Sequence, residues 1–547
     1  MPDTTAPTHT DATHTDATHT DAVVIGAGFS GIYMVRQLAR LGLDVRAFEA
    51  AETVGGTWYW NTYPGARCDC LSMEYSFSFD RELVEAWDWT ERYPAQPEIL
   101  RYLEFAADKL DVRRHFTFST RVESAVWDDE TSLWTVVTDA GEQVTARYVV
   151  TAVGCLSTGQ TPDFAGLDAF TGETYHTSTW PKEGVDFTGK RVGVIGTGSS
   201  GIQVIPLVAE EAEHLTVFQR TPAFSLDCGN RALTEEEKAD FKANLEEYRK
   251  ETRKFPAGLI TDILEVNAMD ISEEERTAIY EERWQRHRAP DLLMSFPDLF
   301  VDRAANETIA EFFRGKIRAA VDDPETAETL TPRTYPLGAK RITLDTDYFA
   351  TYNRDDVTLV SVKDDPIVGL TPTGLATQDN EYELDAVVFA TGFDAVTGPL
   401  LGIDIRGREG QTLRDRWADG PTTYLGIGVD GFPNLFMLTG PQSPNVLTNV
   451  VVAIEQHVEW TTDLIAHMEK EGVRTTEPTP TAVKEWTSEA LALADQTLYP
   501  EGDSWYTGAN IPGKPRAILS YVGGLHTYTD ICDDVAADGY RGFELVR

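Results

Sequence analysis

Two glycine-rich turns constrain the fold of this chain more than any other feature. Each turn follows a short apolar run and precedes apolar residues at helical spacing. The turns are Gly26-Ala27-Gly28-Phe29-Ser30-Gly31 and Gly196-Thr197-Gly198-Ser199-Ser200-Gly201. In a strand–turn–helix unit, free backbone N–H groups and the helix dipole bind a pyrophosphate at the start of the helix. The sequence therefore predicts an α/β fold with two Rossmann-like dinucleotide-binding domains.

The residue about twenty positions after each turn distinguishes the two sites. It is Glu49 after the first turn and Arg220 after the second. A carboxylate there accepts hydrogen bonds from ribose hydroxyls, whereas an arginine accommodates a 2′-phosphate. We therefore expect two different dinucleotides, the second of them NADPH. A third glycine match, Gly426–Gly431, runs into Pro433; because proline prevents a helix from starting there, we interpret this match as a turn.

Composition excludes several classes of protein. The 547 residues carry a formal net charge of −42, which argues against binding to nucleic acids or to an anionic membrane. We find no apolar run long enough to span a bilayer, and the N-terminus lacks the basic and apolar regions of a signal peptide. Five cysteines without a C-x-x-C pair indicate a cytoplasmic protein and argue against a flavin disulfide reductase. No metal site is predicted.

Three further segments have recognisable patterns. Residues 1–21 repeat Thr-His-Thr-Asp-Ala and are expected to form a disordered arm until the first strand begins at Ala22. Residues 232–323 are expected to form a helical insertion, with capping boxes at Thr234–Glu237 and Ser272–Glu275. Near the C-terminus, helical spacing predicts an amphipathic helix with His457 on its surface.

Two long motifs resemble those of one family of flavoenzymes. Between the glycine turns lies Phe170-Thr171-Gly172-Glu173-Thr174-Tyr175-His176-Thr177-Ser178-Thr179-Trp180-Pro181, which resembles the Baeyer–Villiger monooxygenase signature F-x-G-x3-H-x3-W-P at every fixed position. The stretch from Gly55 to Asp69 is similar to the family's other long motif. The resemblance extends from Ala22 to the C-terminus. Within the family, Gly440-Pro441-Gln442-Ser443-Pro444 is more similar to the phenylacetone and steroid branch than to the cyclohexanone enzymes.

The resemblance implies domains, cofactors and a reaction. Residues 22–153 and 386–547 would form the FAD-binding domain, and residues 154–231 and 324–385 the NADP-binding domain. NADPH would reduce FAD, and O2 would then form a flavin peroxide. Attack of that peroxide on a ketone substrate would give an ester or a lactone. The sequence does not identify the natural ketone or the oligomeric state.

The resemblance also implies roles for single residues. Arg341 would stabilise the charge of the peroxide, and Asp69 would hold Arg341 through a charge-assisted hydrogen bond. His176 would have a conformational role in the hinge between the domains. The 2′-phosphate of NADPH would be bound by Arg220, Thr221 and Lys340. The other expected cofactor contacts are Gly26, Gly28, Phe29, Ser30, Gly31, Glu49, Thr57, Trp58, Tyr75, Val122, Gly196, Thr197, Gly198, Ser199, Ser200, Gly201 and Trp505, with Asp69 and Arg341.

The residues leave two other functions open. A related flavin monooxygenase would oxygenate nitrogen or sulfur in place of inserting oxygen beside a carbonyl. A redox-sensing protein of a different class would bind FAD and NADP without oxygenating anything. The reaction product distinguishes an N- or S-oxygenating enzyme from a Baeyer–Villiger monooxygenase. Ketone-stimulated consumption of NADPH and O2 would exclude the redox-sensing protein.

Overall fold

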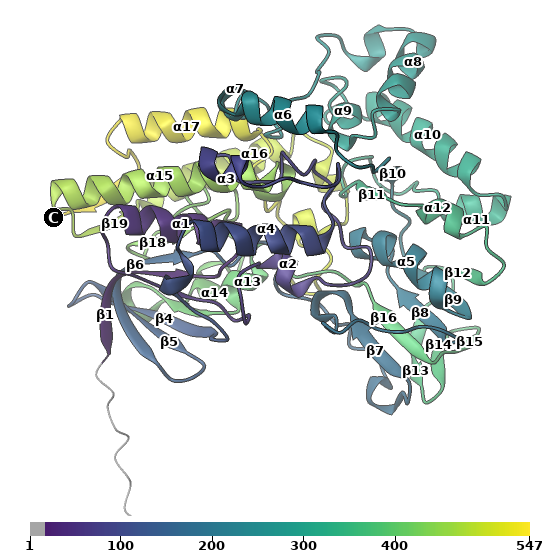
Figure 1. Ribbon diagram of the computed structural model, residues 1–547, viewed down its shortest axis with the longest axis horizontal. Coiled ribbons are helices and arrows are strands. Elements are labelled where there is room, and N and C mark those ends of the chain that lie inside the picture. The colour runs from purple at the N-terminus through teal and green to yellow at the C-terminus, as the bar shows by residue number, and fades with distance from the viewer. Residues whose placement is uncertain (1–16) are drawn as a thin grey trace, which may run out of the picture.

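Two sheets of mainly parallel strands organise the computed structural model, which describes residues 17–547 (Figure 1). The first sheet has the order β17 (Asp404–Arg406), β4 (Val122–Asp128), β5 (Leu133–Thr138), β6 (Gln143–Thr151), β1 (Thr18–Ile25), β2 (Val45–Phe48) and β3 (Phe116–Thr117), and β18 (Leu435–Met437) also pairs with β6. The second has the order β12 (Val357–Ser361), β9 (His214–Gln219), β8 (Arg191–Ile195), β16 (Ala386–Phe389) and β7 (Glu173–His176). The predicted α/β fold is confirmed.

Helices from distant parts of the sequence pack on these sheets. In the first unit, α1 (Phe29–Arg40) lies against α15 (Val450–Glu471), and α4 (Gln96–Lys109) packs beside them. Figure 1 shows the purple α1 next to the yellow-green α15. In the second unit, α5 (Ser199–Glu211) follows the second glycine turn and contacts α12 (Tyr348–Thr351). The first unit is therefore completed by chain that follows the second.

Smaller elements complete the two units. The small sheets are β10 (Ser225–Asp227) with β11 (Thr343–Asp345), β13 (Ile367–Thr371) with β14 (Gly374–Thr377) and β15 (Glu381–Glu383), and β19 (Thr475–Pro478) with β20 (Phe543–Val546). The remaining helices outside the insertion are α2 (Thr57–Trp60), α3 (Arg81–Glu85), α13 (Gly398–Leu401), α14 (Leu413–Arg416), α16 (Pro480–Ala494) and α17 (Leu525–Ala537). Among the described residues, no helix has the length and apolarity needed to cross a membrane.

The helical insertion shares a core with the second unit. Its helices are α6 (Glu235–Ala243), α7 (Leu245–Thr252), α8 (Glu273–Trp284), α9 (Ala289–Leu293), α10 (Arg303–Ala320) and α11 (Pro324–Thr329), so the helical segment extends beyond the predicted end at residue 323. Both predicted capping boxes are confirmed, at the starts of α6 and α8. The ring of Phe313 from α10 lies 5.8 Å from that of Phe224, which follows β9. The insertion is thus anchored by apolar packing and is not a separate body.

Helix α7 also reaches the first unit through a cluster of charges. Arg249 in α7 and Arg253, which caps its C-terminal end, both form ion pairs with Glu459 of α15, and the Arg253 pair measures 2.8 Å. One turn earlier in α15, the buried Glu455 accepts hydrogen bonds of 2.6 Å from the backbone N–H and the hydroxyl of Ser78. Burial raises the pKa of Glu455, while these two donors oppose that rise by favouring the charged form. This cluster joins the insertion to the first unit.

Three predictions require correction. Strand β1 begins at Thr18, not Ala22, because Thr18 to Thr20 pair with β6 through Val144 to Ala146; residues 1–16 of the predicted arm lie outside the described residues. Strand β16 belongs to the second sheet, where it pairs with both β8 and β7, so the return to the first unit begins after Phe389 and not at residue 386. His457 is fully buried, because α17 covers that face of α15.

The two glycine turns have nearly the same backbone. Gly26 and Gly196 have φ values of +107° and +108°, in the region that favours glycine. A Cβ at either position would lie 2.5 Å from a backbone carbonyl oxygen, that of Ala152 or that of Ala390. Each turn therefore packs directly on the next strand of its own sheet, and this close approach requires glycine.

We predict that Gly196→Ala destabilises the protein by about 1–3 kcal/mol, because it adds a steric clash to an unfavourable φ. Gly198→Ala in the same turn is the matched control, since φ there is −80° and a Cβ would meet nothing within 4 Å. Denaturant unfolding gives the free energy of unfolding of each variant, measured with the cofactors bound and with the cofactors removed. Equal stability of the two variants would contradict the steric argument.

Candidate active site

The first glycine turn leaves a surface of backbone that fits a pyrophosphate. Gly28 precedes α1 and no side chain caps the helix, so the first N–H groups of α1 are left available to a ligand. Gly56, with φ of +52°, approaches so closely that a Cβ there would lie 2.9 Å from the Gly28 Cα. Ser30 and Gly31 follow in the first turn of α1 and are buried. Two backbone segments thus meet where the phosphates of FAD are expected.

The expected aromatic contacts to FAD lie together beside this turn. Trp58 in α2 donates a hydrogen bond of 3.2 Å from Nε1 to the hydroxyl of Tyr75. The ring of Phe29 lies 5.2 Å from that of Tyr75, edge to face. Thr57 begins α2 one residue earlier. Val122, by contrast, lies at the start of β4 and is buried in a different apolar cluster, away from these rings.

Glu49 lies at the end of β2, as the spacing predicted. Its carboxylate accepts hydrogen bonds of 2.6 Å from the N–H of Ala27 in the glycine turn and 2.8 Å from the N–H of Ala51. Burial raises its pKa, while the two N–H donors oppose that rise. The carboxylate therefore has oxygen lone pairs beside the turn, which suits it to accept from ribose hydroxyls.

The second glycine turn offers a comparable but more open site. Gly198 again precedes its helix without a side-chain cap, and the space around its Cα is open. Ser199 accepts a hydrogen bond of 2.8 Å from Thr343, and Thr197 donates one of 3.0 Å to the carbonyl of Thr221. These contacts tie the turn to the segment after β9. Ser200 and Gly201 complete the first turn of α5.

Two positive side chains lie at the edge of this second site. Arg220 is exposed directly after β9, and Lys340 is close enough for their charges to interact. Desolvation and the charge of Arg220 lower the pKa of Lys340 to about 8, against the opposing effect of Asp503. The Lys340 ammonium lies 5.1 Å from the centre of the Tyr335 ring. Two neighbouring cations have the charge that would suit a doubly charged anion such as a phosphate.

Arg341 and Asp69 form a bidentate ion pair between the two units. Arg341 donates hydrogen bonds of 2.7 Å from Nε and from Nη2 to the two carboxylate oxygens. A third bond, of 3.0 Å, runs from Nη1 to the carbonyl oxygen of Val446. Desolvation opposes the positive charge, but Asp69 outweighs it and raises the pKa of Arg341. The guanidinium is thus fixed in direction and permanently charged.

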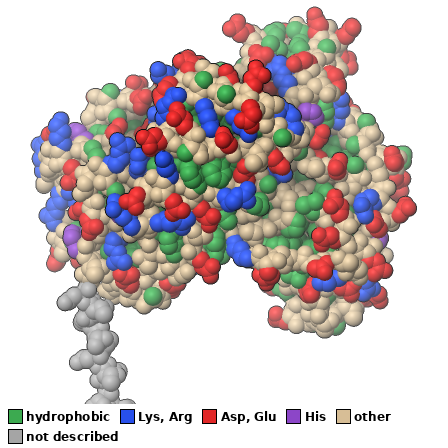
Figure 2. Space-filling view, viewed as in Figure 1, with side chains coloured by type: hydrophobic (Ala, Val, Ile, Leu, Met, Phe, Trp, Pro, Cys, Tyr) green, Lys and Arg blue, Asp and Glu red, His purple; other side chains and the backbone are tan. Residues whose placement is uncertain are grey.

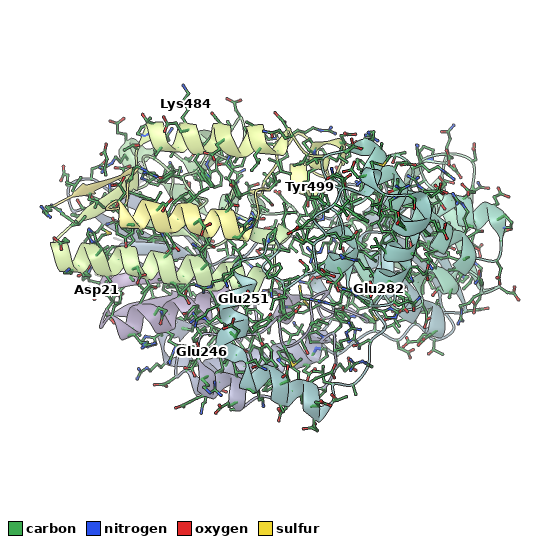
Figure 3. The ribbon with its side chains drawn as sticks, turned by 90° about the horizontal axis from the view of Figure 1, so that it is seen from above. Asp21, Glu246, Glu251, Glu282, Lys484 and Tyr499 are labelled. Atoms are coloured by element: carbon green, nitrogen blue, oxygen red, sulfur yellow. The ribbon has the colours of Figure 1, made fainter. Side chains whose placement is uncertain are left out.

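The sequence missed Tyr506 as a neighbour of this pair. Its buried hydroxyl faces the Arg341 guanidinium; desolvation raises the pKa of Tyr506, while Arg341 lowers it. The predicted Trp505 lies with its ring 4.4 Å from that of Tyr506. Tyr499, labelled in Figure 3, stacks on Phe300 at 5.5 Å where the C-terminal segment meets the insertion. The only signal in the sequence was the position of Tyr506 next to Trp505.

His176 joins the two connections between the units. Its Nδ1 accepts a hydrogen bond of 3.1 Å from the N–H of Ser178, so Nε2 carries the proton and donates to the carbonyl of Gln160 at 3.0 Å. Gln160 is also bonded to Thr391 and to the carbonyl of Gly392 in the second connection. His176 therefore holds two crossing segments side by side and does not face Arg341.

The molecule is hollowed between the two units. Figure 2 shows green apolar side chains inside this hollow and blue cationic groups on its edge. The exposed fractions of the Arg341 and Asp69 side chains, 30% and 21%, show that the pair is only partly covered.

Comparison with known proteins identifies the family. A family model described as FMO-like, flavin-binding monooxygenase-like, matches residues 20–230. A Baeyer–Villiger monooxygenase of Pseudooceanicola batsensis is 45% identical over 528 residues, which cover 96% of each chain. The chain belongs to the Baeyer–Villiger monooxygenases. It is therefore an FAD-containing, NADPH-dependent enzyme, and the reading as a non-catalytic redox sensor is wrong.

Solved structures of this family have the same architecture. Oxidized steroid monooxygenase bound to NADP is 50% identical, with a TM-score of 0.93 over 97% of this chain and 100% of that one. Cyclohexanone monooxygenase from Rhodococcus sp. Phi1 bound to NADP+ is 48% identical, with a TM-score of 0.94 over 97% and 100%. The structure of OTEMO in complex with FAD and NADP is 42% identical, with a TM-score of 0.93 over 96% of this chain and 99% of that one, and both predicted cofactors are thus confirmed. The identities to the steroid and cyclohexanone enzymes are too similar to assign the chain to one branch.

We predict that His176 stays neutral, with its proton on Nε2, throughout the neutral pH range. Desolvation lowers its pKa, and protonation would break the bond that Nδ1 accepts from Ser178. Because the unfolded chain binds that proton first, the contribution of His176 to stability is complete above pH of about 6.5 and falls below it. Nitrogen-15 NMR, assigned by difference from His176→Gln, measures the tautomer. A midpoint above about 6.5 would contradict the geometry.

Proposed function

We propose that this enzyme inserts one atom of O2 next to the carbonyl of a ketone, giving an ester or lactone, and that Arg341 is its main catalytic residue. The observation that supports this role is the bidentate pair with Asp69 at the junction of the units. When bound, FAD would accept a hydride from NADPH and react with O2. Arg341 would stabilise the negative charge that develops on oxygen, and Asp69 would hold the guanidinium in place.

The surroundings of Arg341 suit a site that must exclude water. The aromatic rings of Tyr499 and Trp505 both pack on Tyr506. Desolvation raises the pKa of Tyr506 and of Tyr499, while the nearby charge of Arg341 lowers it. In a dry site an oriented positive charge stabilises an oxyanion more strongly than it does in water. The carbonyl of Val446 fixes Nη1, so the loop after β18 would line the ketone pocket.

We assign NADPH to the second glycine turn and FAD to the first. Arg220 and Lys340 would bind the 2′-phosphate, with Thr221 beside them, while Glu49 would accept from the ribose of FAD. Trp58 and Tyr75 would contact the flavin, and Trp505 the nicotinamide region. His176 would set the angle between the units, since both of its ring nitrogens are engaged in holding the two connections.

The net charge argues against two classes of partner, and the cysteines indicate the cell compartment. A net charge of −42 disfavours nucleic acids and anionic membranes. All five cysteines are free and buried, as expected for a protein of the reducing cytoplasm.

Arg341→Ala should reduce ester formation by about 100- to 1,000-fold, because the developing oxyanion loses its cation. Flavin reduction by NADPH should survive, since Arg341 does not bind the phosphates. Mass spectrometry of products from phenylacetone, cyclic ketones and steroids, with stopped-flow absorbance of FAD, measures both steps. Arg333→Ala, which removes an exposed ion pair with Glu328, is the control. A wild-type yield of ester from Arg341→Ala would refute the catalytic role of Arg341. An N- or S-oxide as the sole product of the wild-type enzyme would refute the proposed reaction.

Arg220→Ala should raise the KM for NADPH by about 10- to 100-fold, through loss of a charged hydrogen bond of about 1.5–3 kcal/mol, and leave the KM for NADH unchanged. In the wild type, the KM for NADPH should also rise between pH 7 and 9, because Lys340, with its pKa lowered to about 8, loses its proton. Steady-state kinetics with both cofactors measures the ratio. An unchanged ratio of the KM for NADPH to the KM for NADH would show that Arg220 does not contact the phosphate.

A further inference from the structure

Two cysteines flank the aspartate that holds Arg341. The sulfur atoms of Cys68 and Cys70 and a carboxylate oxygen of Asp69 all lie within 4.8 Å of one another. Both cysteines are buried, with 6% and 7% of their surface exposed. The N–H of Cys70 donates to the Cys68 sulfur at 3.4 Å, and the Cys70 sulfur lies 3.9 Å from the Asp69 Oδ1. The bend at Asp69 thus turns two thiols and a carboxylate toward one point.

This donor set has a definite metal preference. Thiolates select soft or borderline cations such as Zn²⁺, and Cd²⁺ is a still softer analogue, whereas Mg²⁺ and Ca²⁺ prefer oxygen ligands. A tetrahedral Zn²⁺ holds sulfur at about 2.3 Å and carboxylate oxygen at about 2.0–2.2 Å, so its ligands lie roughly 3.4–3.8 Å apart. The separations here reach up to 4.8 Å, so the three side chains would have to draw together by about 1 Å to bind the metal. Three protein ligands also leave a fourth position for water.

We propose that Cys68, Asp69 and Cys70 form a binding site for one thiophilic divalent cation, and that the bound cation inhibits the enzyme by weakening the hold of Asp69 on Arg341. The inhibition rests on the proposed role of Arg341, whereas the binding does not.

The charges around the cluster favour an exchange of protons for metal. Without a metal, the carboxylate of Asp69 balances the charge of Arg341 in their ion pair. The phenols of Tyr75, Tyr93 and Tyr248 also lie near the cysteines, and burial raises the pKa of each phenol. Binding a dication releases two thiol protons, so two thiolates, one carboxylate, the dication and the guanidinium again sum to zero. No net charge is buried.

The same arrangement explains the inhibition. Arg341 uses both oxygens of Asp69, each at 2.7 Å. An oxygen that coordinates the cation gives up electron density to it and accepts a weaker hydrogen bond from the guanidinium, which the dication also repels, so the two-point hold is weakened. The positive charge remains in the site, but its direction is no longer fixed. Oxygen insertion should therefore fall more than flavin reduction.

Equilibrium dialysis of the FAD-loaded full chain against micromolar CdCl2, with excess MgCl2 to occupy surface carboxylates, tests the binding. The wild type should bind one more Cd²⁺ per chain than Cys70→Ser, or bind it at least about tenfold more tightly, because a direct ligand is lost. Cys228→Ser is the control: this buried cysteine lies 3.4 Å from Thr346 and outside the cluster. Cd²⁺ bound at other sites on the chain contributes equally to all three proteins and cancels in the comparison.

Product assays with the same samples test the inhibition, each variant compared with its own metal-free rate. Cd²⁺ should lower ester formation in the wild type and in Cys228→Ser, and at least about tenfold less in Cys70→Ser. Equal Cd²⁺ binding by all three proteins would overturn the site. Binding without loss of ester formation would overturn the coupling to Arg341. If the enzyme formed no ester with any ketone, the proposed function would fail, while dialysis would still decide the metal site.

Discussion

The ion pair between Asp69 and Arg341 is the interaction on which the rest of the active site depends. The two residues lie 272 positions apart, one after α2 in the first unit and the other before β11 in the second. A bidentate carboxylate–guanidinium pair fixes both the distance and the direction of its partners. The relative position of the units therefore sets the direction of the guanidinium that we propose as catalytic. Any motion between the units is also a motion of that charge.

Two other features limit how the units can move. The connections around Gln160 and Thr391 run antiparallel and are bonded to each other and to His176. On the opposite side, α7 of the insertion is anchored by Arg249 and Arg253 to Glu459. The insertion shares its core with the second unit and its charges with the first. It therefore acts as a second bridge, and its salt bridges are easier to rearrange than a packed apolar core.

Local patterns predicted the local structure well. The glycine turns could be recognised because the strand, the turn and the helix start are adjacent in sequence, and the failing third match could be rejected for the same reason. Both capping boxes depend on residues three positions apart and were found directly. Arg341 could be selected among the arginines only through the resemblance to a family, because nothing in its neighbourhood along the chain distinguishes it.

The errors came from contacts between distant segments. His457 has polar neighbours along its helix, yet α17 buries it, and its Nδ1 accepts from the N–H of Thr439 at 3.1 Å. The apolar sequence of β16 is compatible with either sheet. Only its pairing with β8 and β7 shows that it belongs to the second one.

The sequence by itself predicted two dinucleotide cofactors, one of them NADPH, because the glycine turns and strand ends that indicate them are local features of the chain. The resemblance implied that Asp69 holds Arg341, but only the tertiary structure decided the bidentate geometry of that pair and its closeness to two sulfur atoms, because this geometry depends on how two separately folded sheets pack together.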